Sequence, residues 1–131
     1  MKKTLIAFII ILGTYGCHNN VEVDRTEMYY ITNSLSTKIS YQLIGISENR
    51  ANQLGYKVEA DIDPNSTVEV FKGSFGVGHL EIDSIKVLDI NKVSIYKVDM
   101  LSFVNKSNAV KINEYVVKCT LDITPTLINQ K

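Results

Sequence analysis

Apolar and polar residues alternate along much of the chain, and the clearest stretch is Glu114–Thr124. Within it every second residue from Tyr115 onward is apolar, and the residues between are polar with one exception. A helical period would place Lys118 and Asp122 on the same stripe as Tyr115, whereas a period of two separates them. The pattern therefore predicts a strand with one buried face.

The same period of two recurs upstream in shorter stretches, separated by segments rich in Asn, Asp, Ser and Gly. Residues Asp99–Val104 fit either a helical turn or the continuation of a strand. About seven short strands without a long helical pattern predict an all-β fold, either an antiparallel sandwich or a barrel. The six further strands are expected at residues 28–32, 38–43, 56–62, 67–71, 85–88 and 93–95, with breaks at 33–34, 47–55, 63–66, 73–78 and 106–109.

The first 17 residues follow a different pattern. Lys2 and Lys3 precede an apolar run over residues 5–12, which is typical of a secretory signal peptide. The run corresponds to about 12 Å of helix, and a spanning helix needs roughly 20 apolar residues. We therefore predict a signal peptide at 1–16, a polar tether at 17–27 and a folded domain at 28–131.

Gly16 and Cys17, which end this segment, resemble the lipobox of bacterial lipoproteins. Thr14 and Tyr15 stand where that motif usually has Leu and a small residue. The resemblance implies cleavage before Cys17 and acylation of that cysteine with chains such as palmitate, which anchor the protein in the membrane. In such lipoproteins, an Asp directly after the cysteine resembles a signal for retention in the inner membrane. This chain has His18 at that position, so the resemblance implies that the protein is anchored in the outer membrane and faces the periplasm. An ordinary cleaved signal peptide is the alternative.

Several features of the chain together resemble small bacterial lipoproteins with an immunoglobulin-like domain, most of which have no assigned function. These features are the lipobox, the tether, the first strand with Ile31–Ser34, the turn at Asp63–Thr67 and the strand opening at Asp83–Ile85. The resemblance implies an antiparallel immunoglobulin-like sandwich of about seven strands.

Composition excludes several other classes of protein. The 131 residues suit one domain and contain 14 basic and 14 acidic residues, so there is no basic excess for nucleic acid. Because 45% of the residues are apolar or aromatic, the chain is not a disordered acidic one. Two cysteines are too few for a disulfide-dense scaffold.

Residues suited to catalysis are sparse. Of the two histidines, His18 lies in the predicted tether and His79 ends a glycine-rich segment. No His or Cys spacing fits a zinc site. The order of glycines in Gly73–Gly78 differs from the dinucleotide fingerprint, and a flexible connection explains it better than a nucleotide site. We expect no enzyme activity, no metal, no cofactor and no nucleotide.

Two further groups of residues carry weaker signals. Glu59, Asp61 and Asp63 share one face of a predicted strand, and without a dense Asp/Asn run this pattern favours a solvated face over a calcium site. Ser84 lies in an Asp-Ser-Ile sequence that looks like an O-glycosylation acceptor of some Gram-negative bacteria. Cys119 occupies the apolar phase of the last strand, which predicts a buried, inert thiol with a raised pKa.

The glycine-rich connection is the candidate binding loop, because loops carried on rigid sheets often bind ligands. Its candidate ligand contacts are Lys72, Phe75 and His79. Phe75 has two interpretations: it is an exposed aromatic anchor for a sugar ring or a protein, or, in the interpretation that we favour, it folds back and plugs the end of the sandwich.

These observations lead to a lipid-anchored binding or interaction module of the cell envelope, without catalysis. Its partners would be the membrane, through Cys17, and an envelope protein or a glycan. Two alternatives are an immunity protein or inhibitor of an envelope hydrolase, and a pilus-like subunit that pairs its terminal strand with a neighbour.

Overall fold

The computed structural model describes residues 25–75 and 81–130, and for Arg25, Ser74 and Phe75 it describes the backbone alone. The predicted signal peptide, Cys17, His18 and His79 lie outside the described residues. The elements are β1 (Arg25–Asn33), β2 (Ile39–Ile44), α2 (Glu48–Gln53), β3 (Glu59–Ile62), β4 (Thr67–Phe75), β5 (Ser84–Leu88), β6 (Ser94–Asp99), α3 (Met100–Lys106), β7 (Asn108–Asn113), β8 (Val116–Ile123) and α4 (Pro125–Ile128).

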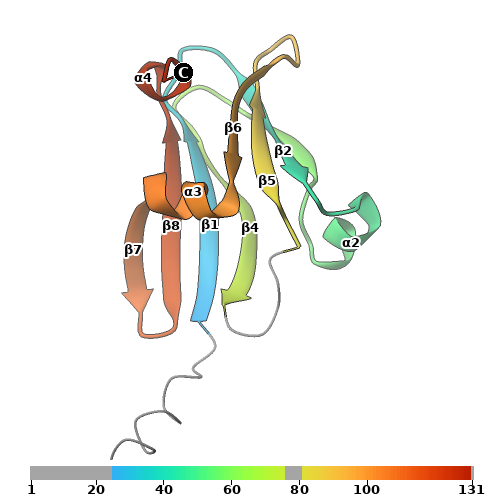
Figure 1. Cartoon of the computed structure of the whole chain (residues 1–131), viewed down its shortest axis with the longest axis vertical. Helices are drawn as coiled ribbons and strands as arrows, with labels where there is room; N and C mark the ends of the chain where they lie inside the picture. The colour runs from blue at the N-terminus through green and yellow to red at the C-terminus, as the bar shows by residue number, and fades with distance from the viewer. Residues whose placement is uncertain (1–24, 76–80, 131) are drawn as a thin grey trace, which may run out of the picture.

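The strands form two four-stranded sheets, in the orders β4-β1-β8-β7 and β3-β2-β5-β6 (Figure 1). Side chains from both sheets join one buried core, which confirms the predicted all-β sandwich. One pair of strands departs from the expected antiparallel arrangement: β1 and β8 run parallel. Parallel neighbours need a long crossover connection, and here the rest of the domain provides it.

The strand predicted with the clearest alternation is β8, and its buried face is confirmed. Cys119, Leu121 and Ile123 are all buried, and they alternate with more exposed residues. Tyr115 was expected on the same face, but it lies in the turn before β8 and is 48% exposed. Because β8 pairs with β1 on one side and β7 on the other, the terminal strand has both of its neighbours within the chain. Strand exchange through β8, on which the pilus-like alternative depended, would require breaking one of these pairings.

Strand β7 was not predicted, and residues 106–109 were expected to break the chain. All six residues of β7 are exposed, so no face of this strand produces a hydrophobic alternation. It is held by antiparallel pairing with β8 at the rim of the sandwich. The described residues therefore contain eight strands, where the pattern predicted about seven.

Pairing also moves several predicted boundaries. Strand β1 begins at Arg25, inside the segment expected to be tether, and its pairing with β4 extends to Arg25 opposite Phe75. Strand β4 accordingly includes Gly73, so the first half of the predicted glycine-rich loop is strand. Strand β3 begins at Glu59, three residues after the expected Tyr56.

Three short helices occur in the part of the chain that the structure describes, and α3 shows that residues 100–106 are helical. Asp99 caps α3, its side chain accepting a hydrogen bond from the Ser102 backbone nitrogen at 2.9 Å. The helix lies in front of β8 and β1 in Figure 1 and buries Phe103 completely. Within the described ranges, the helices are too short to form an apolar membrane span.

An aromatic cluster fills the core beneath α3. The ring of Tyr29 stacks on Phe71, with centroids 4.3 Å apart, and meets the edge of Phe103 at 5.7 Å. The Tyr29 hydroxyl donates to the Glu27 carboxylate. Burial, and then this hydrogen bond, raise the pKa of Tyr29 above its usual value.

A buried polar residue closes the opposite end of β1. The Asn33 side chain is fully buried and donates to the carbonyls of Thr37 at 2.9 Å and Ile62 at 3.1 Å. Its side-chain oxygen accepts from the Leu35 nitrogen at 3.0 Å. One amide thus joins the end of β1, the turn after it and the end of β3, and every polar atom of the side chain has a partner.

Candidate functional site

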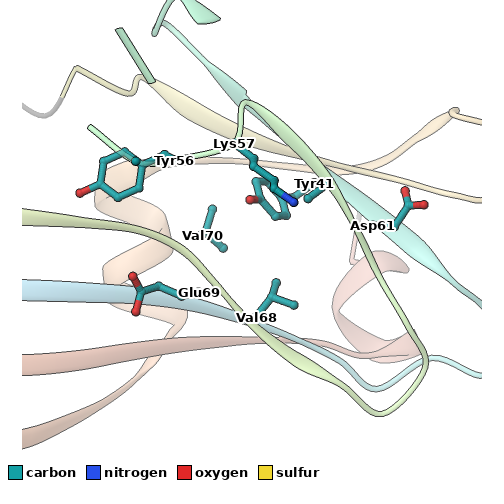
Figure 2. A pocket seen from close by; sticks show the side chains of 9 residues that line it. Tyr41, Tyr56, Lys57, Asp61, Val68, Glu69 and Val70 are labelled. Atoms are coloured by element: carbon teal, nitrogen blue, oxygen red, sulfur yellow. The ribbon is translucent and has the colours of Figure 1, made fainter. Parts of the chain in front are cut away.

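A cleft of about 330 Å³ opens between the edge strand of each sheet, β3 on one side and β4 on the other (Figure 2). We call it the β3–β4 cleft. Its lining combines aromatic, aliphatic and charged side chains: Tyr41, Gly55, Tyr56, Lys57, Ala60, Asp61, Val68, Glu69 and Val70. A shallower depression continues beside it along Lys57–Asp61. The volume falls in the range of ordinary small-molecule sites.

The cleft exists because the two sheets are not hydrogen-bonded to each other along this edge. The segment that leads from α2 into β3 crosses near the gap, after a turn at Gly55 with a φ of 79°. Tyr56 ties this segment to β4, since its hydroxyl donates to the Lys72 carbonyl and its ring meets the edge of Phe71 at 6.2 Å. One end of the cleft is thereby fixed by Tyr56.

Tyr41 is the most deeply buried polar side chain of the lining. It lies on the inner face of β2 and is only 3% exposed. Figure 2 shows Tyr41 and Lys57 on one side of the cleft and the valines of β4 on the other. Among the described residues, the Tyr41 hydroxyl forms no hydrogen bond, and no fully buried side-chain polar atom lacks a partner. The hydroxyl oxygen is therefore not itself fully buried but reaches the solvent of the cleft. Burial raises the pKa of Tyr41, so the hydroxyl stays protonated and can both donate and accept.

Three charged residues surround the opening: Lys57, Asp61 and Glu69. One oxygen of Glu69 accepts from the Tyr30 hydroxyl at 2.8 Å, and one oxygen of Asp61 lies 3.3 Å from the Lys92 ammonium. Within the described residues, the second oxygen of each carboxylate has no partner. The rim therefore offers free acceptors beside the lysine donor.

The acidic face predicted from the sequence is contacted by lysines. The Lys92 ammonium lies 2.9 Å from Glu59 and 3.3 Å from Asp61, and Lys38 lies 3.0 Å from Asp63. All these side chains are substantially exposed. No group of three His, Cys, Asp or Glu side chains suited to a metal occurs between residues 25 and 75 or between 81 and 130.

The candidate contacts of the glycine-rich segment are only partly placed. Lys72 is an exposed residue of β4, opposite Met28 of β1, and its carbonyl is the group that Tyr56 holds. The backbone of Phe75 ends β4, while its side chain and all of His79 lie outside the described residues. The structure thus connects Lys72 to one end of the cleft through its backbone.

Sequence reasoning missed the tyrosines of the cleft. Tyr41 and Tyr56 both fall on the apolar phase of the strands predicted at residues 38–43 and 56–62, and this pattern indicates no site. The available signal was their hydroxyl, because a buried tyrosine usually needs a hydrogen-bond partner.

Two other predicted sites have clear surroundings. Ser84 is the first residue of β5 and is only 6% exposed, so a sugar attached there would not fit the folded strand without displacing its neighbours. Cys119 is a buried free thiol with 2% exposure, as predicted. Burial, and then the nearby Glu27 carboxylate, raise the pKa of Cys119.

Chemically, the β3–β4 cleft can hold a small ligand between apolar walls and hydrogen-bond it at its floor and rim. Comparison with known proteins gives no matching family model, curated protein or solved structure.

Proposed function

We propose that this protein is a binding module of the bacterial cell envelope, anchored by lipid at Cys17, and that the β3–β4 cleft is its ligand site. The module binds without catalysing a reaction. Its acylated N-terminus holds the sandwich at the outer membrane, where the cleft takes up its ligand from the periplasm.

The observation that carries this proposal is the hydroxyl of Tyr41. The ring of Tyr41 is buried, while its hydroxyl forms no hydrogen bond with another described residue and is open to the cleft. A ligand in the cleft can therefore hydrogen-bond this hydroxyl in place of water. Tyr41 lies among apolar walls with three charged residues at the opening, the mixture that small-molecule sites commonly present. The lipobox-like Gly16-Cys17 sequence supports the location.

Ligand binding at the cleft is tested by thermal stability in the presence of envelope fractions. A ligand at 100 times its dissociation constant stabilises the folded state by about 2.7 kcal/mol, which raises the melting temperature measurably. We expect one fraction to stabilise the wild-type chain and to have a weaker effect on Tyr41→Phe, which keeps the ring and loses only the hydroxyl. If no fraction stabilises the wild type more than this variant, the cleft is not the site.

Anchoring is tested separately with Cys17→Ser. We expect this variant to leave the membrane fraction or to accumulate as an uncleaved precursor, because serine lacks the sulfur that carries the acyl chains. The control is Cys119→Ala, which should remain in the membrane fraction. A cleaved Cys17→Ser product that stays with the membrane would contradict lipid anchoring.

A further inference from the structure

We infer that the ligand of the β3–β4 cleft is a neutral saccharide unit. This inference rests on the proposed function, since it names the class of ligand for the same site. The argument combines the charges at the opening, the apolar walls and the hydrogen-bonding groups that have no partner within the described residues.

The charges at the opening disfavour a charged ligand of either sign. Asp61 and Glu69 would repel a phosphate or carboxylate that entered between them. Lys57 lines the same opening and would repel a cation, and the Lys92 ammonium, 3.3 Å from Asp61, already offsets part of the negative charge of Asp61. A neutral molecule avoids both repulsions and still finds charged groups, which form the stronger hydrogen bonds.

The walls are apolar and include aromatic rings. Val68 and Val70 line the β4 side and the Tyr41 ring lines the other (Figure 2). Ala60 of β3 also belongs to the lining. Tyr56 stands at the end, held by its hydrogen bond to Lys72 and by contact with Phe71. The C–H faces of a sugar ring fit such walls, whereas a ligand that is polar on all sides would leave them exposed to water.

The hydrogen-bonding groups match a ligand that carries many hydroxyls. The free oxygens of Asp61 and Glu69 need donors, the Lys57 ammonium needs acceptors, and the Tyr41 hydroxyl can use either. Each hydroxyl of a saccharide donates one hydrogen bond and accepts others, so a saccharide suits a lining that mixes donors and acceptors. A purely apolar ligand would bury them without partners, at a cost.

The test uses the full chain in detergent micelles on an array of neutral and charged saccharides, followed by calorimetric titration with each saccharide that the array retains. We expect a neutral saccharide to bind, and Tyr41→Phe to weaken it about three- to tenfold, the effect of one net hydrogen bond. Asp61→Asn should weaken the same saccharide at least as much, because a charged acceptor is lost. Asp61 is an exposed residue, so this variant stays informative if Tyr41→Phe does not fold.

Two matched controls lie away from the cleft. Tyr96→Phe removes a hydroxyl that accepts from Lys106 at 3.2 Å, and Asp122→Asn neutralises an exposed carboxylate on β8. Both should leave the affinity unchanged.

The inference is overturned if the array retains no neutral saccharide, or if both cleft variants bind it as tightly as the wild type. It is also overturned if the envelope fraction that stabilises the wild type through Tyr41 contains no saccharide. In that last case the cleft remains a ligand site and only the class of ligand is wrong. The proposed function itself is refuted if no envelope fraction stabilises the wild type more than Tyr41→Phe.

Discussion

The contribution of α3 to the stability of the sandwich can be measured with two alanine substitutions on the same helix. Phe103 is fully buried and meets the ring of Tyr29 at 5.7 Å, whereas Leu101 is 73% exposed. Both changes replace a large apolar side chain by alanine and raise helix propensity slightly. The difference between the two losses of stability therefore measures the contribution of the side chain that is buried beneath the helix.

Removing a buried phenylalanine typically costs about 3–5 kcal/mol, because the lost transfer free energy is joined by a cavity that the core closes only partly. Phe103 belongs to the upper part of this range, since its neighbour Tyr29 is held by stacking on Phe71 and cannot readily move into the space. For a domain of this size, 1 kcal/mol lowers the melting temperature by about 4 °C or more. We expect Phe103→Ala to melt about 12–25 °C lower and Leu101→Ala to change by less than about 0.5 kcal/mol.

The assay is equilibrium urea unfolding, supported by scanning calorimetry. The slope of the free energy against urea should be unchanged, because both variants expose the same surface on unfolding. The reasoning is refuted if Phe103→Ala costs less than about 1 kcal/mol, or if the two variants lose equal stability. Either outcome would mean that α3 does not seal the core over Tyr29.

Three further predictions concern single residues. Asn33→Ala should cost about 2–3 kcal/mol, because the buried carbonyl of Ile62 and the part-buried carbonyl of Thr37 and N–H of Leu35 lose their partner together; a melting temperature within a degree or two of the wild type would contradict this role. Hydrogen bonds from Ser102 at the start of α3 hold the pKa of Asp99 below its usual value. Asp99 therefore stabilises the fold above its unfolded pKa of about 3.9, and this contribution is lost as the pH falls through the lower folded value. Urea unfolding of Asp99→Asn between about pH 5 and pH 2 should consequently show a smaller loss of stability than the wild type, and an identical pH dependence would exclude this effect. Cys119 should react with a thiol reagent far more slowly in the native protein than in denaturant, since burial hinders access and raises its pKa. Equally fast labelling in both states would show that the thiol is accessible.

The sequence predicted those strands whose two faces meet different surroundings. In β8 the core lies on one side and solvent on the other, so Cys119, Leu121 and Ile123 alternate with polar residues and their burial follows directly. The same reasoning located the inner apolar residues of β2, which are Ile39, Tyr41 and Leu43. It failed at β7, because a strand exposed on both faces places no restriction on which positions are apolar.

The candidate site shows the same limit. Tyr41 was correctly placed on an inner face, but an alternating pattern does not distinguish an inner position in the middle of the sandwich from one beside its open edge. That distinction depends on β3 and β4 belonging to different sheets, which is a property of strand order.

By itself, then, the sequence determined the all-β class, the buried phases of the longer strands, the burial of Cys119 and the unusual character of the first 17 residues. These features depend on local composition and on a period of two, which any stretch of chain carries with it. The tertiary structure alone decided the parallel pairing of β1 with β8, the strand β7, the buried amide of Asn33 and the β3–β4 cleft. Each of these arises where segments distant in sequence meet, and the free energy of such a contact belongs to the pair of segments and not to either one.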